Sequence, residues 1–208
     1  MIREKKNEIS KQRILDAAME EFSKNGYAAA SMNTICSENG ISKGIIYHYF
    51  SSKDELYLLC AQKCFDEITA YLKQIKKSLG GTAEQKMRTY FDARLSFFAD
   101  HPLYLGIFSD ITLNPSEHLS LEIEECRKGF DAMNVSVLKE ILQSITLRKG
   151  LSVNQIIADF SLYMDFYNMH FKAKLTEGKS AAALLKKHEE NCHRQLSILL
   201  YGVSKENI

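Results

Sequence analysis

Four ring side chains stand next to one another in the segment GISKGIIYHYFSSK, residues 40–53: Tyr47, His48, Tyr49 and Phe50. Only residues three or four apart share a face of a helix, so consecutive residues point in different directions. One protein core therefore cannot bury all four rings, and some must face solvent or a partner. The same segment contains two lysines, one histidine and no acid. Lysine and the tyrosine hydroxyl both contact phosphate oxygens, so these residues suit binding to nucleic acid.

Catalytic or metal chemistry is not indicated elsewhere in the chain. Cys60 and Cys64 share a helix face, as do His188 and Cys192, and either pair could begin a metal or redox site. A zinc site needs about four ligands, and no second pair at matching spacing occurs. No phosphate-binding glycine loop, nucleophile-elbow motif or histidine–glutamate zinc motif is present. We expect no enzyme activity, no metal and no cofactor; a role for Cys60 and Cys64 stays open.

Composition limits the remaining classes of protein. The 208 residues are 45% hydrophobic and 25% charged, which is enough apolar material for a large core. The net charge of +1 gives no overall attraction to nucleic acid or membrane, so such binding must come from a local patch. No apolar run approaches the ~20 residues that span a bilayer, and the N-terminus lacks the apolar core of a signal peptide. We expect a cytoplasmic protein with reduced thiols and no membrane partner.

The fold class that the sequence predicts is all-α. Apolar residues recur with helical period along almost the whole chain, and only two prolines occur. Glycines and prolines mark where helices stop. We expect about nine helices, near residues 10–25, 32–39, 43–50, 53–79, 82–99, 102–112, 115–148, 152–177 and 180–201.

Several helix starts follow from capping residues. Asn114 followed by Pro115 has the arrangement of an N-cap and a first-turn proline. Single candidate caps are Ser10, Ser31 and Ser180. Three pairs have capping-box spacing: Ser52 with Glu55, Thr82 with Gln85, and Ser152 with Gln155.

The first three expected helices are short and the others are longer, which places a domain boundary near Ser51. We expect an N-terminal three-helix domain at residues 1–51 and a larger helical domain at residues 52–208. Small Cys36, Gly40 four residues later and then apolar Ile41 have the spacing of a helix-turn-helix.

In the third helix, Ile46 and Phe50 are four residues apart and form the inward face. The residues left facing outward are Lys43, Gly44, Ile45, Tyr47, His48 and part of Tyr49, with Lys53 at the start of the next helix. The alternative is that Tyr47 and Tyr49 only cover the junction with the fourth helix.

The segment RILDAAMEEFSKNGYAAASMNTICSENGISKGIIYHYFSSKDEL, residues 13–56, resembles the N-terminal domain of the TetR (tetracycline repressor) family of bacterial regulators. The matching motifs are ILDAA, GY, ISKGIIYHYF and SKDEL, in order and at family spacing. Cys36 and Asn39 stand where the family commonly has alanine; both should be tolerated.

The resemblance implies a homodimer whose two third helices enter successive major grooves of a pseudo-palindromic, double-stranded DNA operator. The DNA contacts that it implies are Lys43, Gly44, Ile45, Tyr47, His48, Tyr49 and Lys53, with Ser31, Asn33 and Ser42 as supporting phosphate contacts. The N-terminal arm, in which Arg3, Lys5, Lys6, Lys11 and Arg13 outnumber the acids, either adds phosphate contacts or is a solvated tail. We favour the tail.

The last two expected helices carry apolar residues on two faces, so each is wholly buried or packs against a partner. In the resembled family these helices form a four-helix dimer interface, which fits two-fold symmetry. The dimer contacts that we expect are Leu162, Phe166, Met169, Leu184, Asn191 and Ile198.

The central helices are rich in aromatic and methionine residues, which usually form only a core. The resemblance implies that they also hold a small-molecule effector, whose polar groups would meet arginine, histidine or tyrosine. The candidate effector residues are Arg94, Phe98, Tyr104, Phe108, Phe130, Met133, Tyr163, Met164, Tyr167 and His170.

The function hypothesis is a dimeric, ligand-responsive transcriptional regulator, most simply a repressor that its effector releases from DNA. Effector binding would tilt the fourth helix and change the separation of the two recognition helices. One rival is a helical small-molecule-binding protein or enzyme that kept the fold without binding DNA. A second rival is an activator or a DNA-organising protein.

Overall fold

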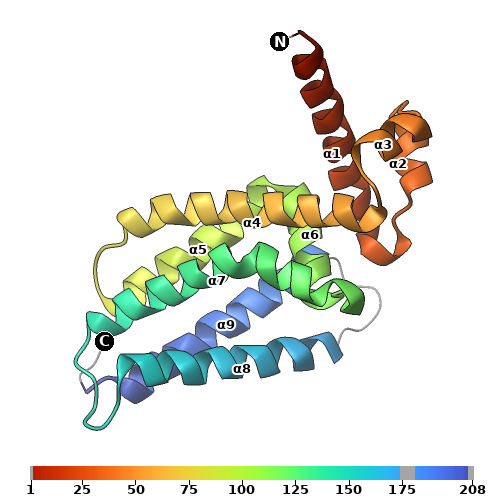
Figure 1. The fold of residues 1–208 in the computed structure, drawn as a ribbon. Coiled ribbons are helices and arrows are strands. Elements are labelled where there is room, and N and C mark those ends of the chain that lie inside the picture. The colour runs from red at the N-terminus through yellow and green to blue at the C-terminus, as the bar shows by residue number, and fades with distance from the viewer. Residues whose placement is uncertain (1, 174–180, 206–208) are drawn as a thin grey trace. The chain divides into compact units, whose positions relative to one another are not determined.

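A computed structural model describes residues 2–173 and 181–205. This part of the chain contains nine α-helices and one short 3-10 helix, η1 (Figure 1). No β-strand occurs in it, only an isolated backbone bridge between Leu147 and Ser204. The all-α prediction is confirmed. The helices are α1 (Ile2–Ala29), α2 (Met32–Glu38), α3 (Lys43–Tyr49), α4 (Lys53–Lys77), α5 (Ala83–Asp100), α6 (Pro102–Leu113), η1 (Glu117–Leu119), α7 (Ser120–Gln143), α8 (Val153–Ala173) and α9 (Ala181–Val203).

The chain forms two compact units. The first consists of residues 1–65 and 101–127, so it contains α1 to α3, the first half of α4, α6 and the start of α7. The second consists of residues 66–100 and 128–208. The domain boundary expected near Ser51, from the change in helix length, stays a prediction. No helix in the described ranges is long and apolar enough to cross a membrane.

In the first unit, α1 packs against α2 and α6 (Figure 1). Ile14, Ala18 and Phe22 are buried along one face of α1, as their four-residue spacing predicts. The backbones of α1 and α6 approach closely at Gly106, because a Cβ atom there would clash with the backbone of Ser23. This close contact fixes α6 against the helix that supports the short helices α2 and α3.

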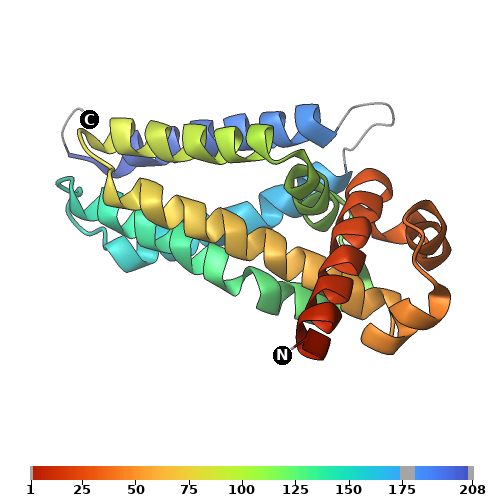
Figure 2. The ribbon, with the colours of Figure 1, turned by 90° about the horizontal axis from the view of Figure 1, so that it is seen from above.

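In the second unit, α5 and α9 lie side by side (Figure 2). The buried face of α9 includes Leu185, Cys192, Leu196 and Leu200. α5 contributes aromatic residues to the same core, among them Phe97 and Phe98. Both helices therefore contribute buried side chains to the core of this unit.

The three predicted capping pairs lie at helix starts, and one of them forms a complete capping box. Thr82 and Gln85 form both reciprocal bonds, at 3.2 and 2.9 Å. The Ser52 hydroxyl accepts from the Glu55 backbone N–H at 3.1 Å, and the Ser152 hydroxyl accepts from that of Gln155 at 3.3 Å. The five helices expected between residues 32 and 112 match the observed ones within two residues at each end.

Three local predictions are wrong. α1 begins at Ile2, so Ser10 lies inside it and is not its N-cap, and the N-terminal arm is helix rather than a solvated tail. Asn114 ends α6 instead of starting the next helix, because its N–H donates to the Asp110 carbonyl at 2.8 Å. The helix expected at 115–148 is shorter: η1 precedes α7, which ends at Gln143. Ser180 lies outside the described residues.

The early end of α7 has a tertiary cause. The Arg148 N–H donates to the Val203 carbonyl at 2.9 Å, and the Lys205 N–H donates to the Thr146 carbonyl at 2.9 Å. The backbone after Gln143 therefore pairs with the end of α9 rather than continuing a helix.

Candidate nucleic-acid interface

The turn between α2 and α3 has the geometry that its sequence predicts. Gly40 has a φ of +59°, which a residue with a side chain rarely adopts. The Ile41 N–H donates to the Cys36 carbonyl at 2.9 Å, which closes a Schellman-type helix end. Cys36 and Ile41 are both buried. The helix-turn-helix is therefore locked by a small residue, a left-handed glycine and an apolar anchor.

Arg13 on α1 adds a second lock on this turn. Its Nη2 donates to the carbonyl of Asn39 at 2.6 Å. Asn39, one of the two positions that depart from the common family pattern, also donates from Nδ2 to the Ile35 carbonyl at 3.2 Å. The carbonyl at the end of α2 is thus paired with a cation, which stabilises α2 because the C-terminal end of a helix dipole is negative.

α3 buries one side and exposes the other. Ser42 caps the helix by accepting from the Ile45 N–H at 3.3 Å. Ile46 and Phe50 are buried, as predicted. The predicted contact residues on the opposite side are exposed: Lys43, Gly44, Ile45 (47% exposed), Tyr47 (56% exposed) and His48.

Tyr47 therefore does not cover a junction with the next helix. Packing within the protein does not explain why an exposed ring lies at position 47. It also does not explain why position 44 is a glycine. A Cβ atom at Gly44 would meet nothing within 4 Å. The absence of a side chain there is not required by the fold, and it leaves room for another backbone to approach α3.

Tyr49 has a different environment from Tyr47. It is half-buried, and its hydroxyl donates to Asn7 Oδ1 on α1 at 2.9 Å. Lys11 Nζ lies 5.9 Å from the centre of its ring, and the His48 ring lies at 4.9 Å. The helical start of α1 thus holds Tyr49 in place, and it brings Lys11 to the same edge of α3.

Lys53, the first residue of α4, lies over the ring of Tyr27 with Nζ 4.4 Å from its centre. The Tyr27 hydroxyl donates to Asp54, and His118 on η1 lies 3.6 Å from the same carboxylate. Burial and the Asp54 carboxylate raise the pKa of Tyr27 to about 12. Lys53 is therefore placed by an internal contact, a role that its sequence position did not reveal.

A carboxylate on α6 joins three elements of the first unit. Asp110 Oδ2 accepts from the Tyr27 backbone N–H at 2.8 Å and from the Tyr57 hydroxyl at 2.7 Å. The helical geometry of α1 is broken just before Tyr27, at Gly26 with a φ of +68°, where a Cβ would lie 2.6 Å from Asp110 Oδ1. Burial raises the pKa of Asp110, an effect that these two donors and Lys53 oppose.

The predicted phosphate contacts at Ser31, Asn33 and Ser42 lie at the starts of α2 and α3. The Ser31 hydroxyl accepts from the Asn33 N–H at 3.1 Å, so both serines act as N-caps. The Asn33 side chain is exposed. Each position remains a predicted contact, and the two serines have a structural role in addition.

The predicted effector residues do not form one group. Tyr104 and Phe108 belong to the first unit, where the Phe108 ring packs 5.9 Å from that of Phe65. In the second unit, Phe98, Phe130 and Met133 are buried. Tyr163 is exposed, Met164 and Tyr167 are half-buried, and the side chain of His170 lies outside the described part.

Arg94 is engaged by the protein itself. Its Nη2 donates to Glu189 Oε1 on α9 at 2.8 Å, and the guanidinium lies 5.4 and 5.1 Å from the rings of Phe91 and Phe130. Glu189 is 1% exposed. Burial alone would raise the pKa of the Glu189 carboxyl, but Arg94 holds it below its usual value. This arrangement is a buried ion pair between α5 and α9.

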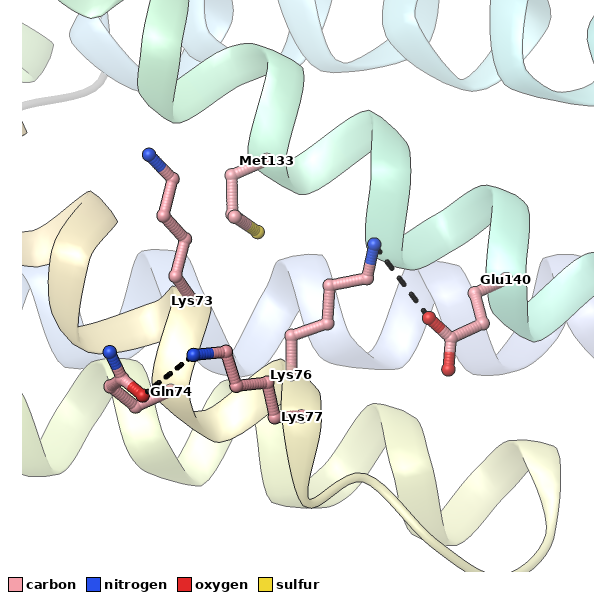
Figure 3. A pocket seen from close by; sticks show the side chains of 6 residues that line it. All are labelled: Lys73, Gln74, Lys76, Lys77, Met133 and Glu140. Carbon is pink, nitrogen blue, oxygen red and sulfur yellow. Dashed lines mark hydrogen bonds and ion pairs between the residues drawn. The ribbon is translucent and has the colours of Figure 1, made fainter.

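A cavity of about 520 Å³ lies in the second unit between the last turns of α4 and the middle of α7 (Figure 3). Only Met133 among its lining residues was predicted as an effector residue. The sequence signal that was missed is a run of cations near the end of α4. The lining residues are Lys73, Gln74, Lys76, Lys77, Met133 and Glu140.

Of the predicted dimer contacts, Leu162, Phe166 and Ile198 are each more than half exposed. Leu184 is half-buried, and so is Asn191, whose amide donates to the Tyr167 hydroxyl at 2.9 Å. The side chain of Met169 lies outside the described residues. Tyr201, at 50% exposure, adds a ring to α9 that was not predicted. Large apolar side chains thus remain uncovered on α8 and α9.

Burial determines the state of the two cysteines that share a face of α4, Cys60 and Cys64. All five are free and buried. Burial raises the pKa of Cys60 to about 12 and also raises that of Cys64, so both are thiols and not nucleophilic thiolates at neutral pH. Among the described residues, no group of three or more His, Cys, Asp or Glu side chains could hold a metal ion.

Comparison with known proteins identifies the family. Residues 14–60 match the model of bacterial regulatory proteins of the tetR family. A fatty acid metabolism regulator protein of Bacillus subtilis is 31% identical over 143 residues, which cover 67% of this chain and 72% of that protein. YerO of Bacillus subtilis, named as an HTH-type transcriptional regulator, is 27% identical over 73% of this chain. That match covers 51% of YerO, so the chain spans about half of that relative's length.

The fold agrees with a solved structure of the same kind. The transcriptional regulator FadR from Bacillus subtilis, in complex with stearoyl-CoA, superposes with a TM-score of 0.63 at 20% identity, over 89% of this chain and 96% of that one. The relatives are transcriptional regulators rather than enzymes, in agreement with the expectation for this chain. The length and identity of the match to the fatty acid metabolism regulator, together with the helix-turn-helix match, place the chain in the TetR family of bacterial transcriptional regulators.

Proposed function

We propose that the chain is a sequence-specific DNA-binding regulator that reads the major groove with the exposed side of α3. The observation that carries this proposal is the pairing of exposed Tyr47 with Gly44, which has open space at its Cβ position. A helix entering a major groove needs side chains that reach base edges and a gap where the DNA backbone comes close. Lys43 and His48 supply charge and hydrogen bonds on the same side.

The phosphate contacts are assigned to the edges of this surface. Ser31, Asn33 and Ser42 lie at the starts of α2 and α3. Tyr49 lies at the end of α3, and Lys53 lies at the start of α4. Lys53 supports the surface from its position over the Tyr27 ring, which its ammonium also contacts. Residues 1–51 form the DNA-binding part in this account, and residues 52–208 carry effector binding and dimerisation.

The protein acts as a homodimer through α8 and α9. The exposed side chains of Leu162, Phe166 and Ile198 supply the apolar surface that a two-fold interface buries. A dimer presents two α3 helices to the two halves of a pseudo-palindromic operator, with half-sites about 34–36 Å apart if they are one turn apart. The operator is in the bacterial cytoplasm, which is where the sequence predicts the protein to be.

The regulator is a repressor that its effector releases, and the effector is a long-chain acyl thioester of coenzyme A. Two relatives support this class: a regulator of fatty acid metabolism and a regulator with the same fold in complex with stearoyl-CoA. The buried rings of Phe98 and Phe130 suit an apolar chain. Release requires that the effector bind the free protein more tightly than the DNA-bound protein.

Selection from a pool of random duplex DNA tests the DNA half of the proposal. The expected product is an inverted repeat that the protein binds and that stearoyl-CoA releases. A pool without enrichment contradicts sequence-specific binding and favours a ligand-binding protein that kept the fold. An enriched operator that stearoyl-CoA does not release contradicts the effector class alone.

A further inference from the structure

The cavity between α4 and α7 has a cationic rim. Three of its lining residues are the lysines Lys73, Lys76 and Lys77, and one is an acid, Glu140. Lys73 and Lys77 are exposed, so two of the ammonium groups are open to solvent. A concave surface of this charge attracts a small anion, since the surrounding protein concentrates the field of the lysines.

Two of the lysines have partners within the protein. Lys76 Nζ donates to the Ser136 hydroxyl and lies 3.7 Å from Glu140 Oε2. Lys77 Nζ donates to Gln74 Oε1 at 3.3 Å (Figure 3). Both lie in the last turn of α4, where a cation also stabilises the negative helix end. Lys76 and Lys77 therefore have structural roles.

Lys73 lies one turn before Lys76 and Lys77. It has neither an internal partner of this kind among the described residues nor a place in the last turn of α4. No hydrogen bond or ion pair to its ammonium is found within the described ranges, 2–173 and 181–205. Figure 3 shows its side chain extended and not joined by a dashed line to any other residue drawn, whereas Lys76 points toward Glu140. Met133 is buried in α7 except for 9% of its surface. The cavity thus combines an apolar floor, a fixed cation at Lys76 and an unpaired cation at Lys73.

We propose that this cavity binds the anionic end of the effector, a phosphate-bearing amphiphile. A phosphate group accepts a hydrogen bond from the exposed Lys73 ammonium, the charge of Lys76 adds to the attraction, and the adjoining apolar part of the ligand contacts Met133. Coenzyme A thioesters combine these two features. The inference rests on the proposed function in one respect, that the chain binds an effector at all.

Titration calorimetry on the full chain tests the cavity. The probes are stearoyl-CoA, coenzyme A without an acyl chain, and stearate, each over a salt series. The proteins are wild type, Lys73→Gln and, as a matched control, Lys139→Gln, an exposed lysine on α7 outside the cavity. We expect Lys73→Gln to weaken stearoyl-CoA and coenzyme A by roughly three- to tenfold, with a shallower salt dependence, and to leave stearate unchanged. Lys139→Gln should behave as wild type.

The outcomes separate this inference from the proposed function. Equal affinities of all three proteins for stearoyl-CoA overturn the cavity assignment and leave the effector class intact. If stearoyl-CoA does not bind wild type, the effector class fails, and protection of Lys73 from amine acylation by coenzyme A decides the cavity. Protection of Lys73 and not of Lys139 supports the site, and equal labelling with and without coenzyme A overturns it.

Discussion

The Asp110 carboxylate on α6 accepts the backbone N–H of Tyr27 at 2.8 Å, at the first residue after the break in α1. The same oxygen accepts the hydroxyl of Tyr57, a residue of α4 that is 1% exposed. One side chain therefore ties α6 to the two helices on either side of the helix-turn-helix. Loss of its oxygens leaves two donors without partners.

Asp110→Ala should destabilise the protein by about 2–4 kcal/mol, since each unpaired buried donor costs about 1–3 kcal/mol. Asp110→Asn keeps an oxygen that can accept from both donors, so it should lose less than half as much. Urea unfolding followed by circular dichroism measures both values. Equal stability of the alanine and asparagine variants would show that these hydrogen bonds do not support the first unit.

Gly44→Ala should separate DNA binding from stability. The residue is helical and exposed, and a Cβ there meets nothing, so alanine should stabilise the helix by about 0.5–1 kcal/mol. The same methyl group should weaken DNA binding at least tenfold, because it occupies the space into which DNA fits. Gly129→Ala is the matched control, an exposed helical glycine of α7 with nothing within 4 Å of its Cβ position. The idea fails if both variants bind DNA as wild type does.

Glu189→Gln should change the dependence of stability on pH. The folded-state pKa of Glu189 is lowered, so its ionised form stabilises the fold above the unfolded pKa of about 4.3, and that contribution is lost as pH falls through the folded pKa. At neutral pH the variant leaves the Arg94 charge buried without its partner, which costs about 3–5 kcal/mol. The difference in the free energy of unfolding between wild type and variant should therefore shrink as the pH is lowered below about 4.

Thermal unfolding of wild type and Glu189→Gln across that pH range measures this difference. Glu190→Gln is the control, since its carboxylate lies on the same helix in an exposed pair with Lys186 at 3.9 Å. A gap between wild type and Glu189→Gln that stays constant with pH would contradict the buried ion pair as its source.

If the proposed homodimer forms through α8 and α9, Phe166→Glu should convert it to a monomer. The side chain is 58% exposed on α8, and a charge in a buried apolar interface is not paired there. Leu121→Glu is the control, since Leu121 is 75% exposed but lies on α7. Sedimentation equilibrium measures the molecular mass. A wild-type protein that is already monomeric, or a Phe166→Glu variant that stays dimeric, would contradict the assignment of the interface.

The features that the sequence predicts well are those set by neighbouring residues. Cys36, Gly40 and Ile41 define the helix-turn-helix because a left-handed glycine and its anchor lie within one turn. Ser52 and Glu55 start α4 for the same local reason. Spacing also separates the buried Ile46 from its exposed neighbours on α3.

The features that were missed depend on contacts between distant residues. Asp110 and Tyr27 are 83 positions apart, and nothing near either of them in the sequence marks the bond. The helical start of α1 is accompanied by the contact of Asn7 with Tyr49, 42 positions away. Asn114 has the residue type and the following proline of an N-cap, but its N–H completes the preceding helix. The residue types alone do not decide whether it ends one helix or starts the next.

The most direct test of the account is fluorescence anisotropy with the selected operator and a scrambled duplex, over a salt series, for wild type, Tyr47→Ala and Tyr47→Phe. Tyr47 is 56% exposed, so its loss should change stability by less than about 0.5 kcal/mol. We expect wild type to prefer the operator, with an affinity that falls linearly with the logarithm of salt, and Tyr47→Ala to lose at least tenfold. Tyr47→Phe should lose less, since the ring remains. If Tyr47→Ala binds the operator as wild type does, α3 does not read DNA through its exposed side, and the central claim is contradicted.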